Sequence, residues 1–228
     1  MASVAQENSL IFLLGDLFEV WYGDDHTDLV TTRFAKATRS AVACGAKVYF
    51  MHGNRDFLLG DAFAEHADIE VLPDPEFLMV NGVVVLLSHG DQFCTDDKAY
   101  QKFRLESRAE KWQSNFLALP LQQRISIATA MRKESAMHKS TAELSIMDVN
   151  AQAVEQTFNG RWPDGHFIGK NGAIVHGHTH RPAVHAPANK PLAIPIHSQE
   201  GELTKGQRIV LPDWDFDHPR ANHHKDRK

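Results

Sequence analysis

The sequence predicts an α/β fold in which polar residues gather at the ends of short buried strands. Short apolar runs alternate along the chain with longer segments of helical periodicity. Four of the apolar runs end at a glycine beside Asp, Asn or His. The length of 228 residues is enough for one large domain with a core, or for a domain with an insertion.

The first part of the chain contains two strands, each followed by a helix. Residues 10–14 and 47–51 are apolar and predict two buried strands. A helix is expected over about residues 31–44, because its apolar residues recur at helical spacing and Gly45 follows as a terminator. A shorter helix is expected over residues 57–66.

The middle of the chain predicts a hairpin and then two amphipathic helices. Residues 77–80 and 83–87 flank Asn81-Gly82, which is the strongest short-range hairpin signal. Residues 98–119 and 121–138 each carry an apolar stripe beside a basic face. Ordinary packing of an apolar face on a core is enough to explain such a pattern.

The last part predicts a short helix over residues 149–158 and two more strands. The strands are expected at residues 173–175 and 207–211. The proline-rich residues 182–195 are expected to be irregular, and residues 213–228 to form a polar tail.

Composition excludes several classes of protein. The net charge of -5 does not supply the basic field that nucleic-acid binders carry. Cys44 and Cys94 lack the spacing of a disulfide framework or a zinc site. No apolar run approaches the roughly 18 residues of a membrane span, and residues 1–9 lack the features of a signal peptide. We therefore expect a soluble, intracellular protein.

The four polar strand ends are the candidate site. They are Gly15-Asp16, Gly53-Asn54, His89-Gly90-Asp91 and Gly177-His178-Thr179-His180. Ligands of open α/β sheets bind at the carboxyl ends of the strands, so these ends can converge on one crevice. A donor set of Asp, Asn and His without sulfur suits Mn²⁺, Fe²⁺ or Zn²⁺. His176, one step earlier in the cluster, is assigned to strand packing.

Together these strand ends resemble the calcineurin-like metallophosphoesterase family. That resemblance implies a β-sandwich flanked by helices and a two-metal centre that hydrolyses phosphate esters or anhydrides. Longer motifs are similar to the UDP-2,3-diacylglucosamine pyrophosphatase family of lipid A biosynthesis; they cover residues 14–25, 53–60, 89–97, 146–150 and 176–185. The narrower resemblance implies one domain over residues 1–228, with a helical cap insertion over about residues 98–145 that receives acyl chains.

The resemblance also implies roles for individual residues. Asp16 would bridge two Mn²⁺ ions, Asn54, His89 and His178 would complete one site, and His180 would contribute to the other. Arg55 would meet phosphate oxygens as charge develops, so Arg55 and Asp16 are the implied catalytic residues. The implied substrate-binding residues are Asn54, Arg55, Asp97, Ser135, Lys139 and His178. Lys139 differs in type from the family, and Ala142 stands where a lysine is expected.

One family motif is not found in this sequence. The family opens with a strand that ends in Asp-x-His, and nothing before Asp16 contains that pair. Either the coding start lies upstream of Met1 or the truncation is real. In the second case the site with His180 should bind metal weakly. The loop of residues 24–26 is expected to be an acidic surface loop and not a substitute.

The expected function is Mn²⁺-dependent hydrolysis of UDP-2,3-diacylglucosamine to 2,3-diacylglucosamine 1-phosphate (lipid X) and UMP. The resemblance places this reaction in the cytoplasm, at the surface of the inner membrane, where basic residues of the cap can face anionic lipid. Two alternatives stay open. One is another metallophosphoesterase, such as a nucleotide phosphodiesterase, although the lack of basic character argues against a nuclease. The other is a non-catalytic relative that binds metal or lipid.

Overall fold

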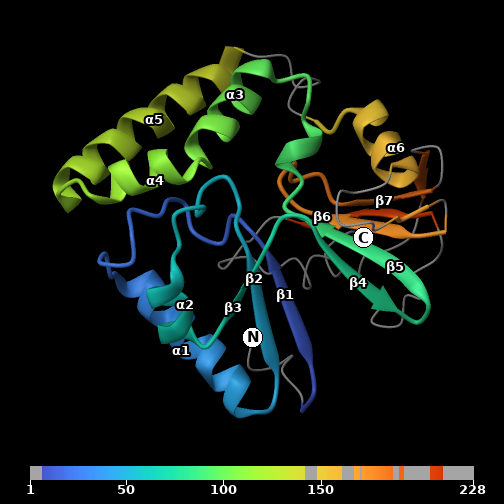
Figure 1. Cartoon of the computed structure of the whole chain (residues 1–228), viewed down its shortest axis with the longest axis horizontal. Coiled ribbons are helices and arrows are strands. Elements are labelled where there is room, and N and C mark those ends of the chain that lie inside the picture. Colours follow the sequence, from blue (N-terminus) through green and yellow to red (C-terminus); the bar gives the residue numbers. More distant parts are fainter. Residues whose placement is uncertain are drawn as a thin grey trace, which may run out of the picture. The chain divides into compact units, whose positions relative to one another are not determined.

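The computed structural model describes residues 7–141, 148–160, 167–169, 171–186, 190–192 and 206–212. The chain divides into two compact units. Unit 1 comprises Met1–Asp74 and Cys94–Asp148, and unit 2 comprises Pro75–Phe93 and Val149–Lys228. The described residues form six α-helices and two β-sheets, which confirms the predicted mixed α/β class (Figure 1). The predicted polar tail lies outside the described residues, as does Ala142.

Unit 1 is built on a three-stranded parallel sheet with the order β1-β2-β3. The strands are β1 (Leu10–Leu14), β2 (Lys47–Met51) and β3 (Glu70–Leu72). The first two match the predicted strands; the third was not predicted, because three residues carry no readable alternation. Leu14 pairs with Met51, so the polar loops after β1 and β2 leave the same edge of the sheet.

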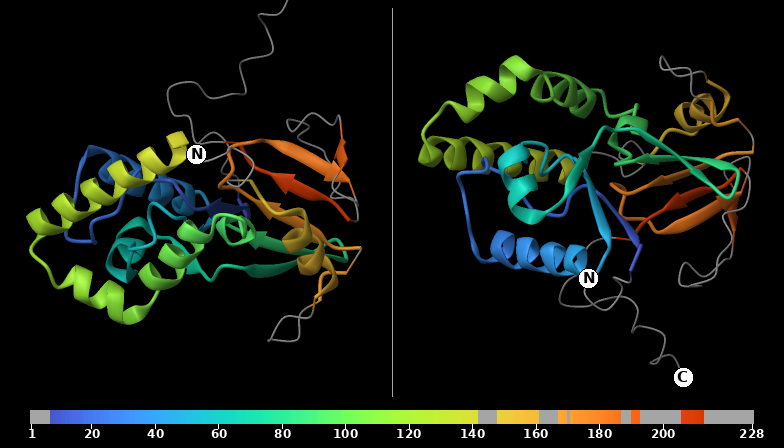
Figure 2. Two further views of the ribbon diagram at one scale, coloured as in Figure 1. Left: turned by 90° about the horizontal axis from the view of Figure 1, so that it is seen from above. Right: turned by 60° about the horizontal axis from the view of Figure 1, so that its bottom comes forward.

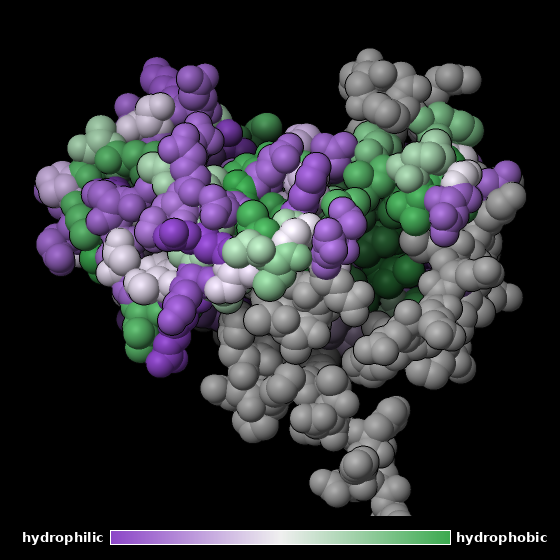
Figure 3. Space-filling model, turned by 90° about the horizontal axis from the view of Figure 1, so that it is seen from below, coloured by the Kyte–Doolittle hydropathy of each residue, from purple (hydrophilic) through white to green (hydrophobic). Residues whose placement is uncertain are grey.

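The two helices on this sheet begin where side chains cap them. Helix α1 (Leu29–Ala43) starts earlier than predicted, because Asp28 and Thr31 form a capping box. Helix α2 (Asp61–Ala67) starts later than the predicted residue 57, because Asp24 accepts hydrogen bonds from the backbone N–H groups of Gly60 and Phe63. Both helices lie along the sheet in Figure 1. Figure 3 shows hydrophilic and hydrophobic side chains interspersed on one face of the molecule.

Between the two segments of unit 2 the chain returns to unit 1 and forms three helices: α3 (Lys98–Ser107), α4 (Glu110–Leu117) and α5 (Leu121–Thr141). The chain runs out along α3 and α4 and returns along α5 (Figure 1). The prediction of one helix over residues 98–119 was wrong. The helix breaks at Arg108, whose Nη2 donates to the Gly53 carbonyl at 2.8 Å and whose guanidinium lies 5.1 Å from the Phe57 ring centroid.

A buried arginine attaches α5 to the loop after β1. Arg124 is only 4% exposed, and it donates to both carboxylate oxygens of Asp25 and to the carbonyls of Tyr22 and Leu119. The hydrogen bond from Arg124 lowers the pKa of the Asp25 carboxyl. The predicted acidic loop is therefore exposed at Asp25, but it also holds helix α5 through Arg124.

Unit 2 is built on a six-stranded mixed sheet with the order β4-β5-β6-β9-β7-β8. The strands are β4 (Glu76–Val80), β5 (Val83–Ser88), β6 (Ala173–His176), β7 (Ala183–Ala186), β8 (Lys190–Leu192) and β9 (Arg208–Val210). The β4–β5 hairpin is confirmed, with positive φ at Asn81 and Gly82. The irregular segment predicted over residues 182–195 was wrong, because β7 and β8 pair there. Pro191 is tolerated because β8 lies at the edge of the sheet.

Helix α6 (Ala151–Asn159) covers part of this sheet (Figure 2). Asn150 caps it by accepting from two backbone N–H groups. Val154 of α6 packs in one cluster with Leu86 of β5 and Ile174 of β6, all nearly inaccessible to solvent. Among the described helices of both units, none combines the length and the apolar character that crossing a membrane requires.

Candidate functional site

In unit 1, Asp16 sits directly after β1 in a left-handed backbone conformation, with φ at +55°. Its side chain is 6% exposed. Oδ1 accepts from the backbone N–H of Arg55 at 3.0 Å, and Oδ2 lies 3.5 Å from Arg55 Nε. The predicted ligand and the predicted phosphate-binding arginine therefore lie side by side, although 39 residues separate them in the sequence.

Gly53 allows this approach because it has no side chain. A Cβ at this position would lie 2.2 Å from the backbone nitrogen of Asp16 and 2.3 Å from its Oδ1. Asn54 follows in the same turn and is partly buried. The turn after β2 thus brings Asn54 and Arg55 to the loop that carries Asp16.

Asp56 holds the two loops together. It is fully buried, and its Oδ1 accepts from the backbone N–H groups of Gly53 and Asp16 at 2.8 and 3.2 Å. Its Oδ2 accepts from Leu17 and Phe18 at 2.7 and 3.3 Å. The sequence analysis assigned no role to Asp56. The only local signal for this role was a carboxylate three residues after Gly53. It was not enough, because three of the four N–H groups that Asp56 binds lie in the loop after β1.

Arg55 is paired on both sides. Besides Asp16 it contacts Glu19, with 2.7 Å between Arg55 Nη1 and Glu19 Oε1. The other carboxylate oxygen of Glu19 accepts from Arg132 Nη2 of α5 at 2.6 Å. The sequence analysis assigned no role to Glu19, and it placed Arg132 only on the basic face of its helix.

The predicted substrate-binding residues of the inserted helices lie in unit 1. Asp97 is 7% exposed and caps α3 by accepting from the backbone N–H of Tyr100 at 2.9 Å. Ser135 is exposed on α5. Lys139 belongs to the same helix, but its side chain lies outside the described part of the chain. Asp97 therefore has a structural role as a cap, and substrate contact by these three residues stays a prediction.

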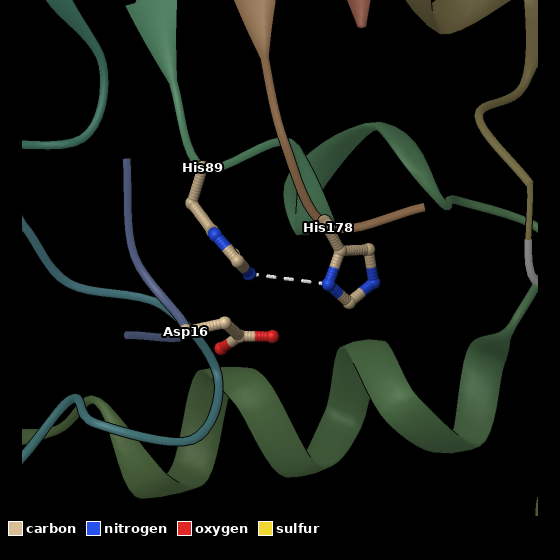
Figure 4. Close-up of side chains that lie close together, drawn as sticks. All are labelled: Asp16, His89 and His178. Carbon is tan, nitrogen blue, oxygen red and sulfur yellow. Dashed lines mark hydrogen bonds between the residues drawn. The ribbon is translucent and has the colours of Figure 1, made fainter. Parts of the chain in front are cut away.

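In unit 2, His89 and His178 meet after neighbouring parallel strands. His89 is fully buried after β5, and His178 follows β6 with φ at +66°. His89 Nε2 lies 3.1 Å from His178 Nδ1, within hydrogen-bond distance, and the ring centroids are 4.9 Å apart (Figure 4). The backbone N–H of Gly177 donates to the His89 carbonyl, which holds the two loops in register.

This pair fits a transition-metal ion. Two neighbouring nitrogen ligands on an ion bound at about 2.0–2.1 Å should lie roughly 3.0–3.4 Å apart. The observed 3.1 Å separation of His89 Nε2 and His178 Nδ1 lies in that range. His180, with φ at +54°, follows two residues after His178 and is partly buried. The structure therefore brings two of the predicted histidine ligands together within unit 2.

His176 ends strand β6 and has a structural role, as predicted. It is fully buried, its Nδ1 donates to the Gly177 carbonyl, and its Nε2 accepts from Arg208 Nη1 at 3.0 Å. Burial, with the nearby charge of Arg208, lowers the pKa of His176 to about 3. A Cβ on Gly90 would lie 2.7 Å from His176 Nδ1, so this strand end also requires a glycine.

The depressed pKa of His176 predicts sensitivity to acid. The unfolded chain binds a proton near pH 6.5 whereas the folded chain does not, so stability falls as the pH drops from 6.5 towards 3. At pH 4.5 this residue should account for a loss of roughly 2–3 kcal/mol. Urea unfolding with EDTA at pH 7.5 and 4.5 measures it. The His176→Gln protein should be less stable than wild type at pH 7.5, and it should lose less stability than wild type between pH 7.5 and pH 4.5. An equal loss in both proteins contradicts the prediction.

Comparison with known proteins gives close relatives. The chain is 43% identical to the UDP-2,3-diacylglucosamine hydrolase of Serratia proteamaculans, over 90% of this chain and 77% of the relative. It is 39% identical to the enzymes of the same name from Chromohalobacter salexigens, over 92% and 77% of the two chains, and from Aromatoleum aromaticum, over 94% and 80%.

No protein-family model matches the sequence. The matched regions, however, cover 90% to 94% of this chain and therefore extend into both units. Similarity of this degree over most of both sequences shows that the chain belongs to the UDP-2,3-diacylglucosamine hydrolase family.

Proposed function

We propose that this protein hydrolyses the pyrophosphate bond of UDP-2,3-diacylglucosamine, giving 2,3-diacylglucosamine 1-phosphate and UMP in lipid A biosynthesis. The observation that carries the proposal is the contact of Arg55 with Asp16: a guanidinium able to bind phosphate lies beside a buried carboxylate of metal-ligand type. The names of the relatives supply the substrate.

The family resemblance supports Asp16, Asn54, His89 and His178 as the residues that would hold one Mn²⁺ ion, and His180 with Asp16 as contributors to a second. The oxygen and imidazole donors suit this ion, and the spacing of the two histidine nitrogens supports shared ligation. When bound, the metal centre supplies a hydroxide nucleophile near neutral pH and neutralises phosphate charge.

The side chains of unit 1 would bind and orient the substrate. Arg55 would donate to phosphate oxygens, since guanidinium and phosphate form short charge-assisted hydrogen bonds. Asp97, Ser135 and Lys139 would contact the sugar and its phosphate. Helices α3 to α5 would form the cap that receives the acyl chains, and the protein would act at the cytoplasmic surface of the inner membrane.

Arg55→Ala should lower kcat/KM for UDP-2,3-diacylglucosamine by about 100-fold, because it removes a charged donor from the reacting phosphate. Release of UMP in the presence of Mn²⁺ is the measurement. Arg33→Ala, which changes an exposed arginine of α1, is the matched control and should retain activity.

Three outcomes distinguish the proposal from its alternatives. UMP release that depends on Arg55 supports it. Hydrolysis of bis(p-nitrophenyl) phosphate without UMP release identifies a general phosphodiesterase instead. Tight Mn²⁺ binding without turnover of either compound identifies a non-catalytic relative, and the number of ions bound per chain then tells whether one site or two are formed.

A further inference from the structure

We infer that Glu19 is a positioning residue for Arg55: its carboxylate fixes the guanidinium beside Asp16 and connects it to Arg132 of helix α5. The inference deepens the proposed function, because it rests on Arg55 as the residue that binds the substrate's phosphate.

The geometry forms a continuous chain of charges within unit 1. Arg132 Nη2 lies 2.6 Å from Glu19 Oε2, Glu19 Oε1 lies 2.7 Å from Arg55 Nη1, and Arg55 Nε lies 3.5 Å from Asp16 Oδ2. The four residues come from three places: the loop after β1, the turn after β2 and helix α5. Glu19 is the member that joins the inserted helix to the strand ends.

The arrangement leaves one terminal nitrogen of Arg55, Nη2, available to a ligand. Its Nε faces Asp16 and its Nη1 faces Glu19, whereas Nη2 makes no hydrogen bond to any residue that the structure describes. A guanidinium is planar, so two fixed nitrogens determine the direction of the third. Glu19 therefore sets where Arg55 can donate to an incoming phosphate oxygen.

Stability does not account for the Glu19 contacts. The Glu19 side chain is 69% exposed and that of Arg132 is 44% exposed. Exposed ion pairs of this kind contribute only about 0–1 kcal/mol to folding. A carboxylate beside the arginine also lowers its attraction for anions, so Glu19 has a cost in substrate binding that orientation must offset.

This trade-off predicts a specific signature for Glu19→Gln, which keeps the shape and removes the charge. Binding of inorganic pyrophosphate, measured by calorimetry with EDTA present, should tighten by about twofold to fivefold. In contrast, kcat for UDP-2,3-diacylglucosamine should fall about tenfold, because the arginine is less well oriented. A residue with a purely structural role would weaken both.

The test is a double-mutant cycle with Arg55→Ala. If Glu19 acts through Arg55, Glu19→Gln should change pyrophosphate affinity and kcat less than about twofold when Arg55 is absent. Glu65→Gln, which changes an exposed glutamate of α2, is the matched control and should have no effect in either background.

The inference is overturned if Glu19→Gln has the same effect with and without Arg55, or if it has no more effect than Glu65→Gln. Failure of the proposed function looks different: the wild-type protein then releases no UMP. In that case the pyrophosphate measurements decide alone, because an effect of Glu19→Gln that vanishes in the Arg55→Ala protein supports the role and one that persists contradicts it.

Discussion

Asp56→Ala is expected to lower the free energy of unfolding by about 3–5 kcal/mol, because it leaves four buried or partly buried backbone N–H groups without their acceptor. These N–H groups belong to both polar loops of unit 1, so the loop that carries Asp16 and the turn that carries Arg55 should come apart together. The expected result is a shift of the urea midpoint with an almost complete loss of UMP release.

Two companion variants make the Asp56 result specific. The free energy of unfolding of Asp56→Asn should lie between those of wild type and Asp56→Ala. One side-chain oxygen remains as an acceptor, whereas the amide N–H₂ group faces backbone donors that it cannot bind. Asp61→Ala, in the exposed first turn of α2, should cost less than about 1 kcal/mol. An Asp56→Ala protein within 1 kcal/mol of wild type would show that water satisfies the loop and that the buried carboxylate does not hold it.

Gly53→Ala is the second change with a large expected effect. Its Cβ would overlap both the backbone nitrogen and the carboxylate of Asp16, at 2.2 and 2.3 Å, and neither can move without displacing the loop. We expect a loss of about 2–4 kcal/mol in stability from the overlap. Mn²⁺ affinity, measured by titration calorimetry, should also fall, because Asp16 is pushed out of place.

Gly82→Ala is the control for the Gly53 experiment. A Cβ there meets no atom of the described residues within 4 Å, so only its positive φ of +77° opposes the substitution, at a cost of about 1 kcal/mol. Its Mn²⁺ affinity and UMP release should match wild type. If Gly53→Ala behaves like Gly82→Ala in both measurements, the close approach of the two loops is not required for the site.

Local patterns in the sequence were enough to predict much of the fold. The strands at Leu10–Leu14 and Lys47–Met51 follow from unbroken apolar runs, and the β4–β5 hairpin follows from Asn81-Gly82, which adopts positive φ readily. Helix boundaries were less predictable, because Asp24 fixes the start of α2 and Arg108 contacts Gly53 where α3 ends. Both contacts join residues far apart in the sequence.

The sequence by itself determined the chemical type of the candidate site. A glycine beside Asp, Asn or His at each of four strand ends identifies the ligand types, and the same motifs connect the chain to its family. Only the tertiary structure decided what holds these residues in place. Asp56 binds backbone 38 to 40 residues away, and Glu19 meets Arg132 across 113 residues. Such contacts have no local pattern. Those of Asp56 arise only when β1 and β2 pair and bring their carboxyl ends together, and that of Glu19 only when helix α5 packs beside the loop after β1.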